Sequence, residues 1–216
     1  NSTLSGNSAT SGGGIYNYYG ITATVSNSTL SGNSATSGGG IYNYGTVTVS
    51  NSIIANTASG NDCDGTRSIT SGGDNLAIDS SCGLSATGDI TNTNPQLGSL
   101  ADNGGGTLTH ALLAGSPAID AGNCSSGPAT DQRGIARPQD DTCDIGAVES
   151  YAPIAVDDGY ATNEDTVLTV IASTGVISND GDSDSAVLTV TVDSGVSNGI
   201  LDLNLDGSFI YTPALN

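Results

Sequence analysis

Oxygen donors with the spacing of a metal site lie in the run NDGDSDS. The run begins at Asn179 and places Asp180, Asp182 and Asp184 at alternate positions. On an extended segment these carboxylates share one side, and they repel one another unless a cation lies among them. Hard oxygen ligands at this density suit Ca²⁺. The competing interpretation is a solvated acidic turn.

Carboxylates that could cleave a polysaccharide need an acid and a partner close together. The candidates in this sequence are Asp62, Asp64, Asp74 and Asp79. They lie beside a cysteine and between glycines, where turn-forming aspartates are common. We therefore expect no catalytic residues and do not expect the chain to be an enzyme.

Two of the three arginines and the single histidine give two other candidate sites. Arg133 and Arg137 lie close in sequence to acids, and a guanidinium pairs well with a carboxylate. We predict a structural ion-pair cluster that fixes a loop; recognition of an anionic ligand is the alternative. His110, the only histidine, stands in the apolar run LTHALL and is expected to be packed and hydrogen-bonded. The predicted cluster consists of Arg133, Arg137, Asp131, Asp144 and Glu149.

Four cysteines form two pairs with the same separation in sequence: Cys63 and Cys82, then Cys124 and Cys143. None has the close spacing of a zinc site. Three disulfide pairings are open, and the local one would close two separate loops worth about 3 kcal/mol each. Disulfides indicate an oxidising, exported environment.

Charge and composition restrict the partners and the fold class. The 216 residues carry a formal net charge of −19, which repels nucleic acid and anionic membrane surfaces. No apolar run is long enough to span a membrane. Apolar residues still make up 36% of the chain, mostly in short β-branched runs between Gly, Asn and Ser. This pattern predicts an all-β fold with many turns.

The elements that position these residues start with an internal repeat. The segment NSTLSGNSATSGGGIYNY occupies residues 1–18 and returns unchanged at residues 27–44. Each unit reads as three short extended pieces, and its period in the twenties is that of one turn of a parallel β-helix. Residues 1–61 contain no charged side chain, as stacking of identical coils requires. We predict four to six coils, reaching to about residue 148.

Strand alternation assigns the side chains of these coils. Ala23 and Val25 are expected inside, over Val47 and Val49. The outward ladders predicted are Thr22 and Thr24 over Thr46 and Thr48, Tyr16 over Tyr42, and Tyr18 over Tyr44. Asparagines at the corners are expected to bond amide to amide along the axis.

Three later runs carry a family resemblance: DCDGTRSITSGGDNLAIDSSCGL, LGSLADNGGGTLTHALLAGSPAIDAG and TDQRGIARPQDDTCDIGAVE. Over about residues 51–150 they resemble the choice-of-anchor Q domain of bacterial surface proteins. The resemblance implies a right-handed parallel β-helix of the pectate-lyase or polymorphic-outer-membrane-protein type. We expect regular coils over 1–60 and a disulfide-braced cap that seals the helix over 61–150.

A composition change marks a second domain, residues 151–216, with ten acids and no base after residue 151. The runs AVDDGYATNEDTVLTV, GVISNDGDSDSAVLTV and GILDLNLDGSFIYTP resemble the bacterial cadherin-like tandem repeat, of the VCBS type. The resemblance implies a partial Ig-like β-sandwich and calcium near domain junctions. It adds the linker acids to the predicted calcium ligands: Asp157, Asp158, Glu164 and Asp165.

These observations favour a secreted or cell-surface protein of a prokaryote, acting as a rigid, calcium-stabilised stalk, fibre or adhesin. Its expected partners are copies of itself or other surface proteins. The alternatives are a carbohydrate-binding module, which would use the tyrosine and threonine ladders, and a polysaccharide-active β-helix enzyme.

Overall fold

The computed structural model describes residues 1–125, 127–139, 142–151, 154–181 and 188–215. Within these residues the protein is almost entirely β-structure, with one 3₁₀ helix at Ala172–Thr174. The chain divides into two compact units, Asn1–Ser150 and Tyr151–Asn216. The predicted all-β fold class is confirmed.

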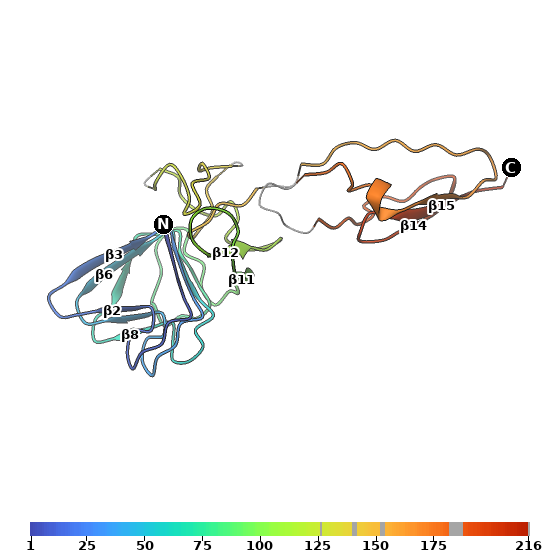
Figure 1. Ribbon diagram of the computed structural model, residues 1–216. Coiled ribbons are helices and arrows are strands. Elements are labelled where there is room, and N and C mark those ends of the chain that lie inside the picture. Colours follow the sequence, from blue (N-terminus) through green and yellow to red (C-terminus); the bar gives the residue numbers. More distant parts are fainter. Residues whose placement is uncertain (126, 140–141, 152–153, 182–187, 216) are drawn as a thin grey trace. The chain divides into compact units, whose positions relative to one another are not determined.

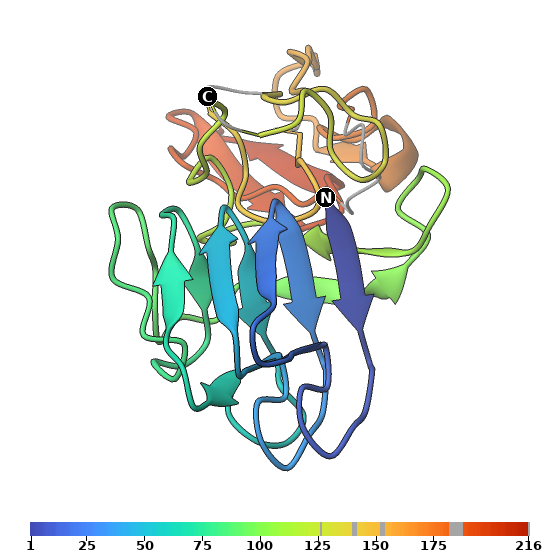
Figure 2. The same cartoon turned by 90° about the vertical axis from the view of Figure 1, so that its left-hand side faces the viewer.

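The first unit contains a β-solenoid made of three parallel sheets, whose stacked strands are visible in Figures 1 and 2. Sheet 1 contains β1 (Ser2–Ser5), β4 (Ser28–Ser31), β7 (Ile53–Ala55) and β10 (Leu76–Ala77). Sheet 2 contains β2 (Ile15–Asn17), β5 (Ile41–Asn43) and β8 (Cys63–Gly65). Sheet 3 contains β3 (Thr22–Ser26), β6 (Thr46–Ser50) and β9 (Ile69–Ser71).

The repeated segments pair residue for residue, as the sequence predicted. Ala23 lies beside Val47 and Val25 beside Val49 in sheet 3, and these side chains point into the core. In sheet 2 the register places Ile15 beside Ile41. Identical coils stack because each strand presents the same side chain to its own copy.

Asparagine ladders run along the corners of the solenoid and confirm the predicted amide stacking. Asn51 donates from Nδ2 to Oδ1 of Asn27 at 2.6 Å. Asn17 donates in the same way to Asn43 at 3.0 Å. Asn27 and Asn51 have φ of 46° and 48°, a left-handed conformation that asparagine tolerates better than most residues. The ladder and the turn therefore select the same residue type.

The predicted number of coils is wrong, because the solenoid makes about three turns. Parallel pairing ends at the bridge between Leu76 and Ile90. Further along, β11 (Leu97–Ala101) and β12 (Thr109–Leu112) pair antiparallel. The glycine run 104–106 lies between them, with φ of 89° and 82° at Gly104 and Gly105. Such backbone reverses the chain instead of continuing a coil.

The segment predicted to seal the solenoid takes two roles. Cys82 and Leu84 join the interior apolar cluster beyond the last coil. The described residues of the segment 97–150, called the brace below, lie instead along the outward face of sheet 1. There Ile53 and Leu76 form a second apolar cluster with brace residues such as Ile145. Strands β4, β7 and β10 of sheet 1 are therefore buried on both faces, which explains the continuous apolar strand at Ile53–Ala55.

The second unit contains one antiparallel sheet of three strands in the order β13-β15-β14. Val170 and Phe209 are its buried apolar residues, and Tyr160 meets Phe209 edge-on with 4.9 Å between ring centroids. Residues 188–192, which alternate like a strand, do not belong to one. The strands are β13 (Leu168–Val170), β14 (Gly199–Leu203) and β15 (Phe209–Pro213).

Candidate functional site

The five charged residues predicted to form an ion-pair cluster lie together in the brace. Arg133 donates from Nε to Asp131 Oδ2 at 2.8 Å. Arg137 donates from Nη1 to Glu149 Oε2 at 2.5 Å. The backbone N–H of Asp144 donates to the same glutamate oxygen at 3.2 Å. All five side chains are buried, so this charge cluster is shielded from large ligands.

The charge cluster organises the backbone around it. Asp131 accepts hydrogen bonds from the backbone N–H groups of Arg133, Ile135 and Glu149. Arg137 donates to the carbonyl oxygens of Asp144 and Gly146 at 3.0 and 2.7 Å. Because these partners are main-chain groups, the arrangement favours the structural role over recognition of an anion.

The buried charge cluster contains more acidic than basic side chains. Three carboxylates face two guanidiniums, which leaves one negative charge uncompensated when all five are ionised. Burial, the dominant effect, raises the pKa of Asp144 and raises that of Glu149 to about 7, against the opposing field of Arg137. One bound proton would make the cluster neutral.

His110 connects the brace to the first coil. Its Nδ1 lies 2.7 Å from the carbonyl oxygen of Gly98, and its Nε2 lies 2.9 Å from Ser5 Oγ. The ring is 8% exposed. Both ring nitrogens have partners within the protein, as expected for a packed structural histidine.

Two of the four aspartates considered for catalysis lie at the last coil. Asp62 is fully buried and accepts a short hydrogen bond from Thr57, while its Oδ2 has no hydrogen-bond partner. Burial raises its pKa to about 6, and the nearby Asp79 contributes in the same direction. Asp79 itself accepts from Ser81 N–H at 2.8 Å and from Asp62 N–H at 3.1 Å. These hydrogen bonds engage both carboxyl groups in fixing the turn.

The other two aspartates, Asp64 and Asp74, lie in different structural settings. Asp64 lies on β8 with its side chain exposed, and its Oδ1 accepts from the N–H of Gly65 at 2.7 Å. Asp74 has φ of 55°, which is the left-handed conformation of a turn residue. These settings support turn and surface roles for the two residues.

Both local disulfides are formed in the structure. Cys63 pairs with Cys82, and Cys124 pairs with Cys143. The first bond ties the last strand of sheet 2 to the segment beyond the solenoid. The second lies in the brace. The first bond therefore fastens irregular chain to a strand of the solenoid, whereas the second joins two segments outside the named strands.

The residues expected to bind calcium are placed only in part. Asp182 and Asp184 lie outside the described residues. Asp180 accepts a hydrogen bond from the N–H of Val156 at 2.7 Å, which brings it next to the segment that carries Asp157 and Asp158. Asn179, Glu164 and Asp165 are surface residues of the same unit. Within the described part of the chain, no group of three His, Cys, Asp or Glu side chains is arranged to hold a metal ion.

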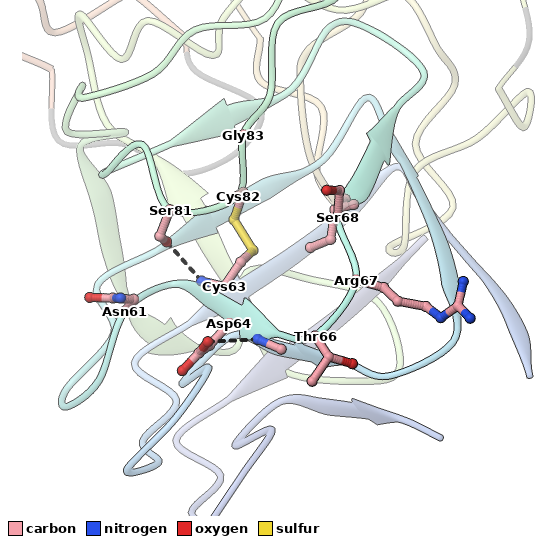
Figure 3. A pocket seen from close by; sticks show the side chains of 11 residues that line it. Asn61, Cys63, Asp64, Thr66, Arg67, Ser68, Ser81, Cys82 and Gly83 are labelled. Carbon is pink, nitrogen blue, oxygen red and sulfur yellow. Dashed lines mark hydrogen bonds between the residues drawn. A yellow bond between two sulfur atoms is a disulfide. The ribbon is translucent and has the colours of Figure 1, made fainter. Parts of the chain in front are cut away.

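A polar groove of about 450 Å³ lies beside the last coil and is drawn in Figure 3. The Cys63–Cys82 disulfide forms part of its wall, and Ser81 Oγ accepts from the N–H of Cys63 at 2.9 Å. The residues that line it are mostly small and polar: Asn61, Cys63, Asp64, Gly65, Thr66, Arg67, Ser68, Ile69, Ser81, Cys82 and Gly83.

Five tyrosines gather on the outside of the solenoid, and we call them the tyrosine surface: Tyr16, Tyr18, Tyr19, Tyr42 and Tyr44. Tyr16 stacks on Tyr42 with 5.2 Å between ring centroids and 12° between planes. Tyr18 and Tyr44 each contact the tyrosine two residues earlier in the same coil, at 6.4 Å. The predicted Tyr16–Tyr42 stack is thus present. The ring contacts of Tyr18 and Tyr44 are with Tyr16 and Tyr42 of their own coils, and not with each other.

Sequence reasoning missed the connection between the tyrosine surface and the groove. The guanidinium of Arg67 lies over the ring of Tyr19, 5.8 Å from its centroid. Tyr19 belongs to the two extra residues by which the first repeat exceeds the second. That difference between otherwise identical copies was the available signal.

Comparison with known proteins identifies the second unit. Residues 150–216 match the family described as Bacterial Ig domain. Neither the curated proteins nor the solved structures gave a match. No helix among the described residues is long and apolar enough to cross a membrane. The class is therefore a β-solenoid joined to a bacterial Ig-like domain, while the choice-of-anchor Q, pectate-lyase-like and cadherin-like resemblances stay predictions.

Proposed function

We propose that this chain is part of an extracellular structural or adhesive protein of a prokaryotic cell surface. The Ig-like match at residues 150–216 supports this assignment. So do the two disulfides, which persist in oxidising compartments outside the cytoplasm. The strong negative charge keeps such a protein soluble and away from nucleic acid.

The observation that carries the proposal is the stacking of identical, uncharged coils in register. β1 and β4 pair residue for residue, as do β2 and β5. Each coil satisfies the backbone hydrogen bonds of the next, so a further copy lengthens the rod by about 4.8 Å without a new interface. Such a unit sets distance and presents the domains attached to it.

Calcium would stiffen the Ig-like unit under this proposal. The oxygen donors that would hold it are Asp180 and the neighbouring Asp157 and Asp158, and the sequence predicts Asp182 and Asp184 as further ligands. The hydrogen bond from Val156 to Asp180 supports the pairing of these two segments. A thermal melt of the whole chain in CaCl₂ and in EDTA tests it, with Asp180→Asn against the exposed Asp193→Asn as matched variants. Equal melting temperatures in both solutions would refute the calcium part of the proposal and would not affect the proposed surface role.

Self-association is a further part of the proposal. In the described part of the second unit, β13 and β14 each pair on one side only, with β15. Unpaired strand edges can accept a strand from another molecule, and repeated contacts of that kind produce fibres. Sedimentation equilibrium over a range of protein concentrations would show association. A monomer at every concentration would refute self-association.

The proposal assigns the chain no catalytic activity. A panel of plant and bacterial polysaccharides, assayed for new reducing ends and for unsaturated products, tests that assignment. Turnover that disappears in Asp62→Asn or Asp79→Asn would establish the enzymatic alternative in its place.

The surface location is tested directly on the producing cells. Antibodies raised against residues 1–150 should label intact cells as strongly as permeabilised ones. An antibody to a cytoplasmic protein, which should label only permeabilised cells, provides the control. Labelling confined to permeabilised cells would contradict the proposal.

A further inference from the structure

The row of side chains that begins with the stacked tyrosines is interrupted in the third coil. The register of sheet 2 places Tyr16 beside Tyr42, and Tyr42 beside Asp64. One face of the Tyr42 ring is covered by Tyr16, with which it stacks. On the other side stands Asp64, which is too small to cover an aromatic ring. The row of aromatic rings therefore ends at Tyr42, and the last strand of the sheet carries Asp64 at that position.

Polar groups surround the end of this row of aromatic rings. Asp64 also lines the groove, together with Thr66, Arg67 and the small polar residues beyond the last coil (Figure 3). Tyr19 lies against Arg67 and closes the surface on that side. Aromatic rings and hydrogen-bonding groups thus meet within one exposed area. Functional surfaces of proteins commonly combine an apolar contact with a few placed polar groups.

The tyrosine surface is more exposed than its structural role requires. Stacking of Tyr16 on Tyr42 accounts for one contact, yet Tyr18 and Tyr19 remain 66% and 63% exposed. Exposed aromatic side chains that lie together usually mark an interaction site, because tyrosine offers an apolar ring and a polar hydroxyl at low entropic cost.

Charge and chemistry select the ligand. A net charge of −19 disfavours polyanions, and the two charged side chains of the site, Asp64 and Arg67, have opposite signs. The largely polar lining of the groove disfavours a lipid or a purely apolar helix. A ring with apolar faces and many hydroxyl groups satisfies both the tyrosines and the polar lining. A sugar ring has this combination.

We propose that the tyrosine surface and the groove form one binding site for a neutral oligosaccharide. A sugar ring stacks on Tyr42 over Asp64, in the place of the missing third aromatic ring. Asp64 accepts hydrogen bonds from its hydroxyl groups, and the following sugar residues extend along the solenoid axis into the groove. The site deepens the adhesive role proposed above by naming the class of target.

The test uses the purified whole chain and neutral hexasaccharides of glucose, mannose, xylose and N-acetylglucosamine, with isothermal titration calorimetry as the readout. Tyrosine fluorescence gives a second readout, since the chain has no tryptophan. At least one hexasaccharide should bind. Tyr42→Ala and Tyr19→Ala should each weaken that binding about 3- to 10-fold, the range for one aromatic contact.

Asp64→Tyr is the most specific variant. Its new ring completes the aromatic row and occupies the sugar position, so binding should be lost while the coil remains folded by circular dichroism. Thr24→Ala, on the outward face of sheet 3 in the same coils, is the matched control and should bind as the wild type does.

Three results would overturn the proposal: binding of none of the four hexasaccharides, binding that Asp64→Tyr leaves unchanged, or tighter binding of polygalacturonate than of every neutral probe. Each is measured on the purified chain. These results are therefore independent of whether antibodies find the protein on the cell surface.

Discussion

Replacing the buried Asp62 by asparagine should stabilise the solenoid at neutral pH. Burial raises the pKa of Asp62 from 3.8 to about 6, although the hydrogen bond from Thr57 opposes the shift. The folded protein therefore holds this proton more tightly than the unfolded chain. The stability contribution is full at pH below 3.8 and is lost as the pH rises through about 6. The whole shift corresponds to about 3 kcal/mol, so we expect a cost of about 2 to 3 kcal/mol at pH 7.5.

Asparagine keeps the shape of the carboxyl group and carries no charge at any of these pH values. Native-state hydrogen exchange of β6 reports the stability of the solenoid separately from that of the Ig-like unit. Asp62→Asn should gain about 2 to 3 kcal/mol over the wild type at pH 7.5 and little at pH 4. Asp64→Asn, which changes an exposed carboxyl group of the same coil, is the matched control variant. A difference that stays constant from pH 4 to 7.5, or a loss of stability at pH 7.5, would refute the reasoning.

Three further changes test the interactions that hold the first unit together. Asn43→Ala removes a buried amide with four hydrogen bonds and should cost about 3 kcal/mol in urea unfolding, whereas a cost below about 1 kcal/mol would contradict the ladder's role. Arg137→Met leaves Glu149 buried without its cation and should lower the free energy of unfolding by about 3–5 kcal/mol at pH 8. The loss should be smaller at pH 5, because the carboxyl group of Glu149 is protonated there. A loss that does not depend on pH would argue against an ionised pair. The double variant Cys63→Ser, Cys82→Ser should lose about 3 kcal/mol, and reducing agent should then have no further effect on that loop.

The repeat made the solenoid predictable in detail. Verbatim copies fix the register, and strand alternation then decides which side chains face the core. The pairing of Val25 with Val49 and the ladder of Asn17 with Asn43 follow from these two facts alone. The ion-pair cluster could also be predicted, because Arg133 and Arg137 lie close in sequence to acids that can pair with them.

The brace and the tyrosine surface were harder to predict for a physical reason. The contact between Ile53 and Ile145 joins residues far apart in sequence, and no periodicity records which face of a sheet receives a second layer. The apolar run SIIA was the only trace of that burial. The contact of Arg67 with Tyr19 depends on a two-residue insertion, whose conformation the repeat does not specify.

The central claim is that the coils are interchangeable units of a stiff spacer. A chain in which residues 27–50 are duplicated in tandem, studied by hydrogen-exchange mass spectrometry, tests it most directly. Because each coil pairs in register with its copy, the inserted strands should be as strongly protected as β4, β5 and β6, and the unfolding free energy should rise. An insert that exchanges as fast as an unstructured loop, with the original coils unchanged, would contradict the account.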